Sequence, residues 1–507
     1  MLPLVEPASM PSTEHWRQRR KLVAIVDIGS NSIRLVVYDG LRRTPLPIFN
    51  EKAVCGLGRG LEASGRLNEA GVVMAEAAIG RFVRLARAMQ VEALHILATA
   101  AVRDATDGPL FVARIENVND VQVRVLSGGE EAKLAALGVL CAVPEADGVV
   151  ADLGGGSLEL VTVSDGGFGR HVTLPLGLLR LTERSGGVRA KAADHVDESL
   201  KKLGWLSQGR GRSLYAVGGA WRAIARLCIA QTAHPILVLD NFTLERSEAE
   251  RLLDLISRQS PKSIEKTPGV PRKRLPTLPM AALVLMKVLQ KVRPSHLVFS
   301  VFGMREGKFF KQLPARLQRQ DPLISSCQAL ANAVGRFPEH AGEIMAWMTP
   351  LFPDETPAQR RVRQAASLLG DVFWSEHPDY RAEQAYLRVL RLPFVGIGHH
   401  DRAALALSVH TRYWPDGETP STQGMRMLLE AGALRRARVI GLALRLCHVL
   451  SGGAPGLLPL TRLVLDRNSL QLDIPDDDPA FRTDLVNRDL DRLAKEMGAG
   501  AVLRRVV

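Results

Sequence analysis

Cysteine pairs, aromatic residues and long apolar runs are scarce in this sequence of 507 residues, and each shortage excludes a class of protein. The five cysteines are scattered without a C-x-x-C pair, which argues against structural zinc and is typical of reduced thiols, so we expect a cytoplasmic protein. No run approaches the roughly 18 apolar residues of a membrane helix, so we expect no membrane partner. Aromatic residues make up 5% and do not alternate with basic ones, so we expect no specific nucleic-acid binding.

The chain has an ordinary globular composition with an excess of positive charge. Hydrophobic residues make up 46% and charged residues 23%, and the length favours roughly three or four domains. Prolines and charges interrupt the first 20 residues, so we predict a loose N-terminal tail over residues 1–20 rather than a signal peptide. The net charge of +13 favours a polyanionic partner, although lysines and arginines that only face water give the same count.

The most informative stretch is GVVADLGGGSLELVTVS at residues 148–164, which predicts a strand, a tight turn and a second strand. The first strand ends at Asp152, and the glycines after it leave backbone N–H groups free to converge on an anion without a lysine. A glycine turn in an ordinary hairpin gives the same pattern. We interpret the turn as a candidate phosphate site formed by Gly154, Gly155, Gly156 and Ser157.

The same pattern of strand, turn and strand occurs earlier in the chain. Residues 24–37, AIVDIGSNSIRLVV, align without a gap on residues 149–162, VVADLGGGSLELVT, and Asp27 falls on Asp152. Self-similarity at this distance predicts a duplicated domain with two facing phosphate loops and a cleft between them. The loop of the first copy adds three candidate phosphate-binding residues, Ser30, Asn31 and Ser32.

Five motifs in chain order carry a resemblance to a known family. They are DIGSNS at residues 27–32, ATAAVRD at 98–104, SGGEEA at 127–132, DLGGGSLE at 152–159 and AVGGAWR at 216–222. Paired loops of this kind resemble those of the superfamily of actin, heat-shock chaperone ATPases and acetate and sugar kinases. Within it, the five motifs together resemble the exopolyphosphatase and guanosine pentaphosphate phosphohydrolase family. Later segments such as FGMREG at residues 302–307 also fit, so the resemblance covers most of the chain.

The resemblance implies an α/β fold of two actin-like (ribonuclease H-like) halves facing a cleft, over residues 21–147 and 148–320. From about residue 321 helical patterns replace strand patterns, which favours an all-α domain over residues 321–453 that resembles histidine and aspartate metal phosphohydrolases. The full metal set of such hydrolases is not found, so we predict no second metal site. A hairpin, a helix and a last strand predict a small α/β domain over residues 454–507.

The resemblance assigns roles to two residues of the motifs. Glu131 corresponds to the family's catalytic base, which orients and deprotonates the attacking water, whereas Glu130 does not. Acids at the start of a helix also complement its dipole, by about 0.3–1 kcal/mol, without any function. Arg103 matches an arginine that faces the phosphate cleft in the family, although an arginine on a helix face is more often structural.

The two copies of the repeat differ at one informative position, where Arg34 of the first copy is matched by Glu159 of the second. Asp152 and Glu159 flank a turn that is also expected to bind anions, and two acids there would repel phosphate. A divalent cation between the acids and the phosphate removes this conflict, and Mg²⁺ prefers carboxylate, water and phosphate oxygens. We therefore predict an Mg²⁺ site at Asp152 and Glu159.

A helix predicted over residues 435–453 carries four further arginines. One of its faces could line a channel for a long anion, and a face that is simply solvated explains the same pattern. The candidate channel residues are Arg435, Arg436, Arg438 and Arg445.

The residues and the resemblance together predict an exopolyphosphatase that removes the terminal phosphate of inorganic polyphosphate with Mg²⁺. A guanosine pentaphosphate 5′-phosphohydrolase would share the same site, and the extra arginines of the later domains favour long chains only weakly. A kinase or chaperone-like ATPase of the same fold is a further alternative. A non-enzymatic polyanion-binding protein is another, and the intact acids argue against it. Members of the family are often dimers, so we expect a homodimer.

Overall fold

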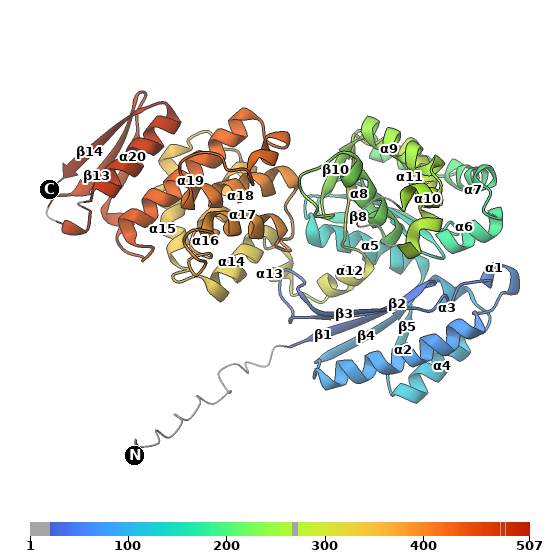
Figure 1. The fold of residues 1–507 in the computed structure, drawn as a ribbon. Coiled ribbons are helices and arrows are strands. Elements are labelled where there is room, and N and C mark those ends of the chain that lie inside the picture. Colours follow the sequence, from blue (N-terminus) through green and yellow to red (C-terminus); the bar gives the residue numbers. More distant parts are fainter. Residues whose placement is uncertain (1–20, 266–271, 477, 482, 507) are drawn as a thin grey trace, which may run out of the picture.

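The computed structural model describes residues 21–265, 272–476, 478–481 and 483–506, so the tail predicted over residues 1–20 lies outside the described residues. Two sheet-bearing halves come first along the chain, followed by a helical region and a small α/β end (Figure 1). Sheets with helices packed against them form both halves, which is the α/β class that the sequence predicts.

The first half is built on a five-stranded sheet in the order β3-β2-β1-β4-β5. Alternate apolar residues of β1 and β2 face α2 and α4 and form one core with them, because successive side chains of a strand point to opposite faces. Figure 1 shows these two helices on the side of the sheet turned away from the rest of the molecule. The strands are β1 Val23–Ile28, β2 Ser32–Tyr38, β3 Pro47–Val54, β4 Ala93–Ala98 and β5 Val123–Val125, and the helices are α1 Leu61–Ser64, α2 Glu69–Ala88, α3 Ala100–Asp104 and α4 Gly108–Asn119.

The second half is built on a six-stranded sheet in the order β10-β11-β9-β6-β7-β8. One face of β6 and β7 packs with α8 and α11 in a single large core. The strands are β6 Gly148–Leu153, β7 Leu158–Ser164, β8 Gly167–Leu174, β9 Ser213–Val217, β10 Phe242–Glu245 and β11 His296–Phe299, and the helices are α6 Leu178–Ser185, α7 Arg189–Lys201, α8 Gly219–Gln231, α9 Arg246–Arg258, α10 Pro261–Ile264 and α11 Leu278–Val292.

The helix α11 is strongly apolar. In the part of the chain that the structure describes, the segment Arg274–Val292 is the one helix with the length and hydropathy of a membrane span. Its apolar residues pack in the core of the second half, where α11 contacts α7, α8 and α9. A buried core helix passes the same test of length and composition.

The two sheets are copies of one another. Strands β6, β7, β8, β9 and β11 occupy the places that β1, β2, β3, β4 and β5 occupy in the first sheet, and β10 is an addition at the edge. The pairing register is also repeated, since Asp27 lies opposite Arg34 and Asp152 lies opposite Glu159. The duplication predicted from the repeat of residues 24–37 is therefore confirmed.

Each half receives one helix from the other part of the chain. The helix α5 Gly128–Ala142 follows the first sheet in sequence but packs on β6 and β7 of the second, while α12 Met304–Lys311 ends the second half and packs on β1 and β2 of the first. The two helices cross closely, because a Cβ atom at Gly138 of α5 would lie 2.2 Å from the carbonyl oxygen of Gly303. The boundary placed after residue 147 stays a prediction.

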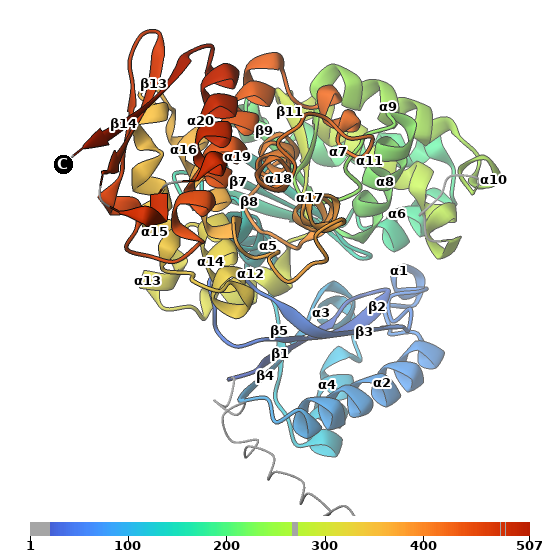
Figure 2. The same ribbon diagram turned by 60° about the vertical axis from the view of Figure 1, so that its left-hand side comes forward.

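The rest of the chain forms a helical region followed by a small sheet with one helix (Figure 2). Residues of α19 and α20 belong to the same apolar core, so the predicted ranges 321–453 and 454–507 share their interior. Their boundary also stays a prediction. The elements are α13 Ala315–Gln318, α14 Pro322–Val334, α15 His340–Trp347, α16 Pro357–Leu369, α17 Arg381–Arg391, α18 His399–Tyr413, α19 Ala431–Ser451, β12 Arg462–Leu465, β13 Ser469–Pro475, α20 Asp484–Met497 and β14 Gly500–Val506.

Candidate functional site

The two predicted phosphate loops have the same turn and touch each other. The backbone N–H of Gly29 donates to the carbonyl oxygen of Ser32 at 3.2 Å, and Gly154 donates to Ser157 in the same way at 3.0 Å. A Cβ atom at Gly156 would lie 2.7 Å from the hydroxyl oxygen of Ser30. The loops therefore face one another, and the structure brings together all the residues predicted to bind phosphate in them, namely Ser30, Asn31, Ser32, Gly154, Gly155, Gly156 and Ser157.

A row of polar side chains crosses each sheet beside its loop. Asp27 lies opposite Arg34, which lies opposite Lys52 on the next strand, and the second sheet has Asp152, Glu159 and Thr173 in the same places. Residues opposite one another on neighbouring strands point to the same face of a sheet. The first row is thus mainly basic and the second mainly acidic, and each lies on the face covered by the exchanged helix.

The two adjacent glutamates at the start of α5, Glu130 and Glu131, have different surroundings. Ser127 is the N-cap, and the Glu130 side chain accepts a hydrogen bond from the backbone N–H of Ser127 at 3.0 Å, which completes a capping box. Hydrogen bonds from Ser127 and then from Arg124 lower the pKa of Glu130 to about 2. Glu130 therefore stabilises the helix end, whereas Glu131, the next residue, is turned inward.

Glu131 contacts the arginine predicted to share its site. Arg103 lies on α3, which begins after β4 with Thr99 as its N-cap. Its Nη1 donates to the Glu131 carboxylate at 3.0 Å and to the carbonyl oxygen of Leu126 at 3.1 Å. The Glu131 side chain is 13% exposed. Arg103 and Glu131, which the sequence predicted as site residues from separate motifs, are thus in direct contact.

Four acids share this part of the molecule and raise one another's pKa values. Burial raises the pKa of Glu131 to about 7, and the charges of Asp152 and Asp27 add to this while Arg103 opposes it. Burial raises the pKa of Asp152 to about 6, against the opposing charge of Arg222. Burial also raises the pKa of Glu159 well above its usual range, with contributions from Glu131 and Asp152. A cation or a proton must offset this concentration of carboxylates.

Asp152 and Glu159 carry carboxylate oxygens, which are ligands of the kind that Mg²⁺ prefers. Glu159 is 2% exposed, and its Oε1 atom has no hydrogen-bond partner among the described residues. No group of three or more histidine, cysteine, aspartate or glutamate residues in the described chain has the arrangement of a metal site. Mg²⁺ does not need three, because it is commonly held by one or two carboxylates together with water and substrate phosphate.

Four partly buried arginines and Lys52 lie beside the acids, and the sequence did not predict them as site residues. Burial lowers the pKa of Lys52 to about 8, with four neighbouring arginines adding to the effect, and lowers that of Arg222 to about 10. Among the described residues, none of the five side chains forms a hydrogen bond or ion pair with another side chain. They are Arg34, Lys52, Arg222, Arg274 and Arg305.

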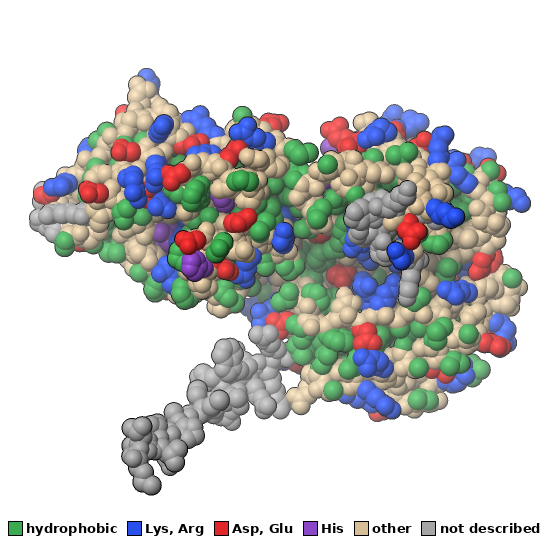
Figure 3. Space-filling view, in the orientation of Figure 1, with side chains coloured by type: hydrophobic (Ala, Val, Ile, Leu, Met, Phe, Trp, Pro, Cys, Tyr) green, Lys and Arg blue, Asp and Glu red, His purple; other side chains and the backbone are tan. Residues whose placement is uncertain are grey.

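Two signals in the sequence could have found part of this cluster. Arg222 and Arg305 each lie within a motif that carries the family resemblance, AVGGAWR and FGMREG. Lys52 is revealed only by the pairing of β2 with β3. Figure 3 shows lysine and arginine side chains gathered where the surface is hollowed between the two sheet-bearing halves.

The arginines predicted to line a channel all have partners on neighbouring elements. Arg435 donates to the carbonyl oxygen of Glu496 at 2.9 Å and Arg438 to its carboxylate at 3.0 Å. Arg445 donates to Asp489 at 3.0 Å, and Arg436 donates to Glu355 at 2.6 Å. These contacts tie α19 to α20 and to the loop before α16, and the structure does not bring the four arginines to the two phosphate loops. The channel stays a prediction.

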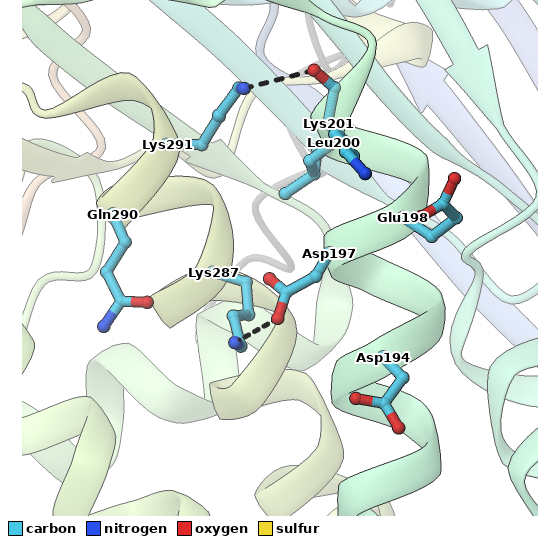
Figure 4. A pocket seen from close by; sticks show the side chains of 8 residues that line it. All are labelled: Asp194, Asp197, Glu198, Leu200, Lys201, Lys287, Gln290 and Lys291. Atoms are coloured by element: carbon cyan, nitrogen blue, oxygen red, sulfur yellow. Dashed lines mark hydrogen bonds and ion pairs between the residues drawn. The ribbon is translucent and has the colours of Figure 1, made fainter.

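A separate surface pocket of about 560 Å³ lies between α7 and α11 (Figure 4). In this pocket Lys287 Nζ lies 2.5 Å from the Asp197 carboxylate, and Lys291 Nζ lies 3.5 Å from the carbonyl oxygen of Lys201. The residues that line the pocket include neither of the phosphate loops.

Comparison with known proteins gives two family models that together span most of the chain. The model described as the Ppx/GppA phosphatase family matches residues 36–316, and the model described as exopolyphosphatase, C-terminal, matches residues 323–503. Exopolyphosphatase 1 of Mycobacterium tuberculosis is 28% identical over 331 residues, which cover 62% of this chain and 95% of that protein. Guanosine-5′-triphosphate,3′-diphosphate pyrophosphatase of Photobacterium profundum is 23% identical over 310 residues, which cover 58% of this chain and 59% of that protein.

A solved structure shows the same fold. The exopolyphosphatase from Cytophaga hutchinsonii superposes with a TM-score of 0.51 at 23% identity, over 56% of this chain and 96% of that chain. The shared part corresponds in extent to the two sheet-bearing halves, whose duplicated strands and facing loops are described above. Since the first family model alone spans more than half of the sequence, the chain belongs to the Ppx/GppA phosphatase family.

Proposed function

We propose that the protein is an exopolyphosphatase, a hydrolase that cleaves the terminal phosphoanhydride bond of inorganic polyphosphate. The observation that carries the proposal is a cluster of four partly buried arginines and Lys52 next to four acids. Removing charges from water is costly unless they are paired, so cations that form no hydrogen bond or ion pair with another side chain among the described residues indicate a ligand with several negative charges. The similarity to exopolyphosphatase 1 of Mycobacterium tuberculosis supports the same substrate.

In this proposal the two loops hold the reacting phosphate. Backbone N–H groups of residues 155–157 and 30–32 donate to the oxygens of the terminal phosphoryl group, and Arg103 adds a positive charge. The basic row of the first sheet then holds the phosphates that follow it along the chain. Mg²⁺ bound at Asp152 and Glu159 would offset the charge of the acids and of the phosphoryl oxygens.

Glu131 activates the water. Its carboxylate accepts a proton from a water molecule as the water oxygen attacks the terminal phosphorus in line with the bond to the bridging oxygen. The new bond between that oxygen and phosphorus forms while the bond between phosphorus and the bridging oxygen breaks. The shortened polyphosphate leaves with the bridging oxygen, and inorganic phosphate is the second product. No covalent intermediate on the protein is required.

The first experiment measures phosphate release from polyphosphate with Mg²⁺ and after chelation. We expect Glu131→Gln to lower kcat by at least about 100-fold, because general base catalysis contributes at least that much, while polyphosphate binding is retained. Glu130→Gln is the matched control, and it should keep kcat within about threefold because glutamine also completes a capping box. A Glu131→Gln variant with most of its activity would remove Glu131 from the role of base.

Guanosine pentaphosphate is the second candidate substrate, because the Photobacterium profundum relative is named for hydrolysis of that class of nucleotide. One structural observation favours polyphosphate. Trp221 lies in the AVGGAWR motif after β9 and is fully buried. Its indole N–H donates to the carbonyl oxygen of Ala281 at 2.9 Å. It is therefore not free to stack on a base. Steady-state rates on both substrates decide between them.

We also propose that the enzyme acts in the cytoplasm as a homodimer. The five cysteines are all free and buried, which suits a reducing compartment. The dimer rests on the family resemblance, and sedimentation equilibrium of the purified chain tests it directly.

A further inference from the structure

Two buried oxygen atoms on neighbouring strands of the second sheet have no hydrogen-bond partner in the part of the chain that the structure describes. One is Oε1 of Glu159 on β7, and the other is the hydroxyl oxygen of Thr173 on β8. The other part of the Glu159 carboxylate receives a hydrogen bond from the Ser157 side chain. Buried polar atoms in folded proteins are nearly always satisfied by protein or by ordered water, so an adjacent pair without protein partners requires an explanation.

The pairing of the strands places these two residues side by side. Glu159 lies directly opposite Thr173, in the row that begins with Asp152. The same row of the first sheet holds Lys52 where the second sheet holds Thr173. The corresponding position is therefore a cation, Lys52, in the first half and a neutral hydroxyl, Thr173, in the second.

Thr173 also contacts the helix that carries Glu131. A Cβ atom at Gly128, the first residue of α5, would lie 2.6 Å from the Thr173 hydroxyl oxygen. The Thr173 side chain thus contacts the start of α5 and lies opposite Glu159 on the neighbouring strand, and both of these belong to the proposed site. A hydroxyl can donate one hydrogen bond and accept others, which suits a group between a carboxylate and a helix N-terminus.

We propose that Thr173 is a positioning residue for Glu159. Its hydroxyl and Oε1 of Glu159 hold one water molecule between them, and this bridge fixes the orientation of the carboxylate toward the metal position beside Asp152. The inference rests on the proposed function, because it assigns Thr173 to the metal side of that site. Groups that orient a metal ligand commonly change metal affinity by about 10–100-fold when they are removed.

The test compares Thr173→Val, which removes the hydroxyl but keeps the shape, with Thr173→Ser, which keeps the hydroxyl. Mn²⁺, which has the same preference for oxygen ligands, serves as the probe, and electron paramagnetic resonance measures its affinity for the full-length protein without substrate. We expect Thr173→Val to weaken Mn²⁺ binding about tenfold and Thr173→Ser to change it by less than about threefold. Thr162→Val on β7 is the control, since the Thr162 hydroxyl donates to the carbonyl oxygen of Arg170, at 3.4 Å.

Parallel measurements separate this inference from the proposed function. Circular dichroism confirms that each variant is folded, and KM for polyphosphate should stay within about twofold, because Thr173 is not among the cations that hold the chain of phosphates. Wild-type Mn²⁺ affinity in the folded Thr173→Val variant overturns the role of Thr173. If the wild-type protein binds Mn²⁺ with the expected ranking of variants but releases no phosphate from polyphosphate, the substrate assignment fails and Thr173 keeps its role. If Thr173→Val does not fold, loss of Mn²⁺ affinity in Thr173→Ser overturns the inference.

Discussion

At the scale of single residues, the contact between Arg103 and Glu131 decides how the proposed base behaves. Burial and two neighbouring acids raise the pKa of Glu131 to about 7, and Arg103 is the group that holds it from rising further. A base must be unprotonated to accept a proton, so kcat/KM of the wild type should fall as the pH drops through this value.

Removing the arginine therefore has a predictable direction. In Arg103→Met the pKa of Glu131 rises, and the acidic limb of the pH profile of kcat/KM should move upward by about one pH unit or more. Arg124→Met is the matched control, because Arg124 pairs with Glu130 and should leave the limb where it is. An unmoved limb in the folded Arg103→Met variant would contradict the assignment of that limb to Glu131.

Lys52 offers a second test at the same scale. It is exposed beside four arginines and forms no ion pair among the described residues, so its charge is available to a bound polyanion. We expect Lys52→Met to raise KM for polyphosphate about tenfold with little change in kcat, because losing uniform binding to a charged group costs roughly 1.5–3 kcal/mol. Lys287→Met in the pocket of Figure 4 should leave both constants unchanged.

At the scale of elements, the sequence predicted the strands and turns of the site well because the signals are local. Alternating apolar residues and the glycine turn depend on neighbours within a few positions. The alignment of residues 24–37 on 149–162 predicted that Asp27 corresponds to Asp152, and in the structure Asp27 pairs with Arg34 in the register in which Asp152 pairs with Glu159. Lys52 and Thr173 could not be found in this way, since each becomes a site residue only when a third strand pairs.

The exchange of α5 and α12 was also beyond the reach of the sequence. Both helices have an apolar face that would suit either sheet, and only the three-dimensional arrangement shows that each covers the sheet of the other half. Gly138, Gly303 and Gly307 are the traces of this crossing in the sequence. Their meaning is clear only when the backbone atoms that they approach are known.

The crossing gives a prediction about stability. Alanine is usually better than glycine inside a helix by roughly 0.5–1 kcal/mol, yet Gly138→Ala should destabilise the protein by about 1–3 kcal/mol, because the new Cβ would lie 2.2 Å from the Gly303 carbonyl oxygen. Gly432→Ala in α19 is the control, since nothing lies within 4 Å of that position. Thermal unfolding of both variants measures the difference, and a Gly138→Ala protein as stable as the wild type would contradict the close crossing.

At the scale of the whole molecule, the two parts of the chain should respond to pH in opposite ways. In the sheet-bearing halves burial raises the pKa of Asp152 and Glu159 above their unfolded values, so their contribution to stability is full at low pH and is lost as the pH rises through the folded values. In the helical region burial lowers the pKa of His399 and His410 to about 4 and that of His448 well below its usual range. Their contribution is full above the unfolded pKa of about 6.5 and is lost as the pH falls toward the folded values.

Hydrogen exchange resolves the two responses. Between pH 7.5 and pH 5, amides of β6 and β7 should become more protected and amides of α18 and α19 less protected, once intrinsic exchange rates are corrected. His410→Asn should reduce the loss of protection in α18, because the Nδ1 atom of His410 has no partner among the described residues and asparagine cannot acquire the charge. A uniform change across the chain would contradict the assignment of the two sets of groups to separate parts.

The crossing of α5 and α12 has a consequence for the folding of each half. A fragment that ends after residue 147 would contain α5, which packs on the second sheet, and would lack α12, which packs on its own sheet. The remaining fragment would contain α12 and lack α5. Neither fragment buries its apolar surface alone, yet together they contain a complete set. We therefore expect two separately expressed fragments to associate and to recover enzymatic activity, as the fragments of a split reporter protein do.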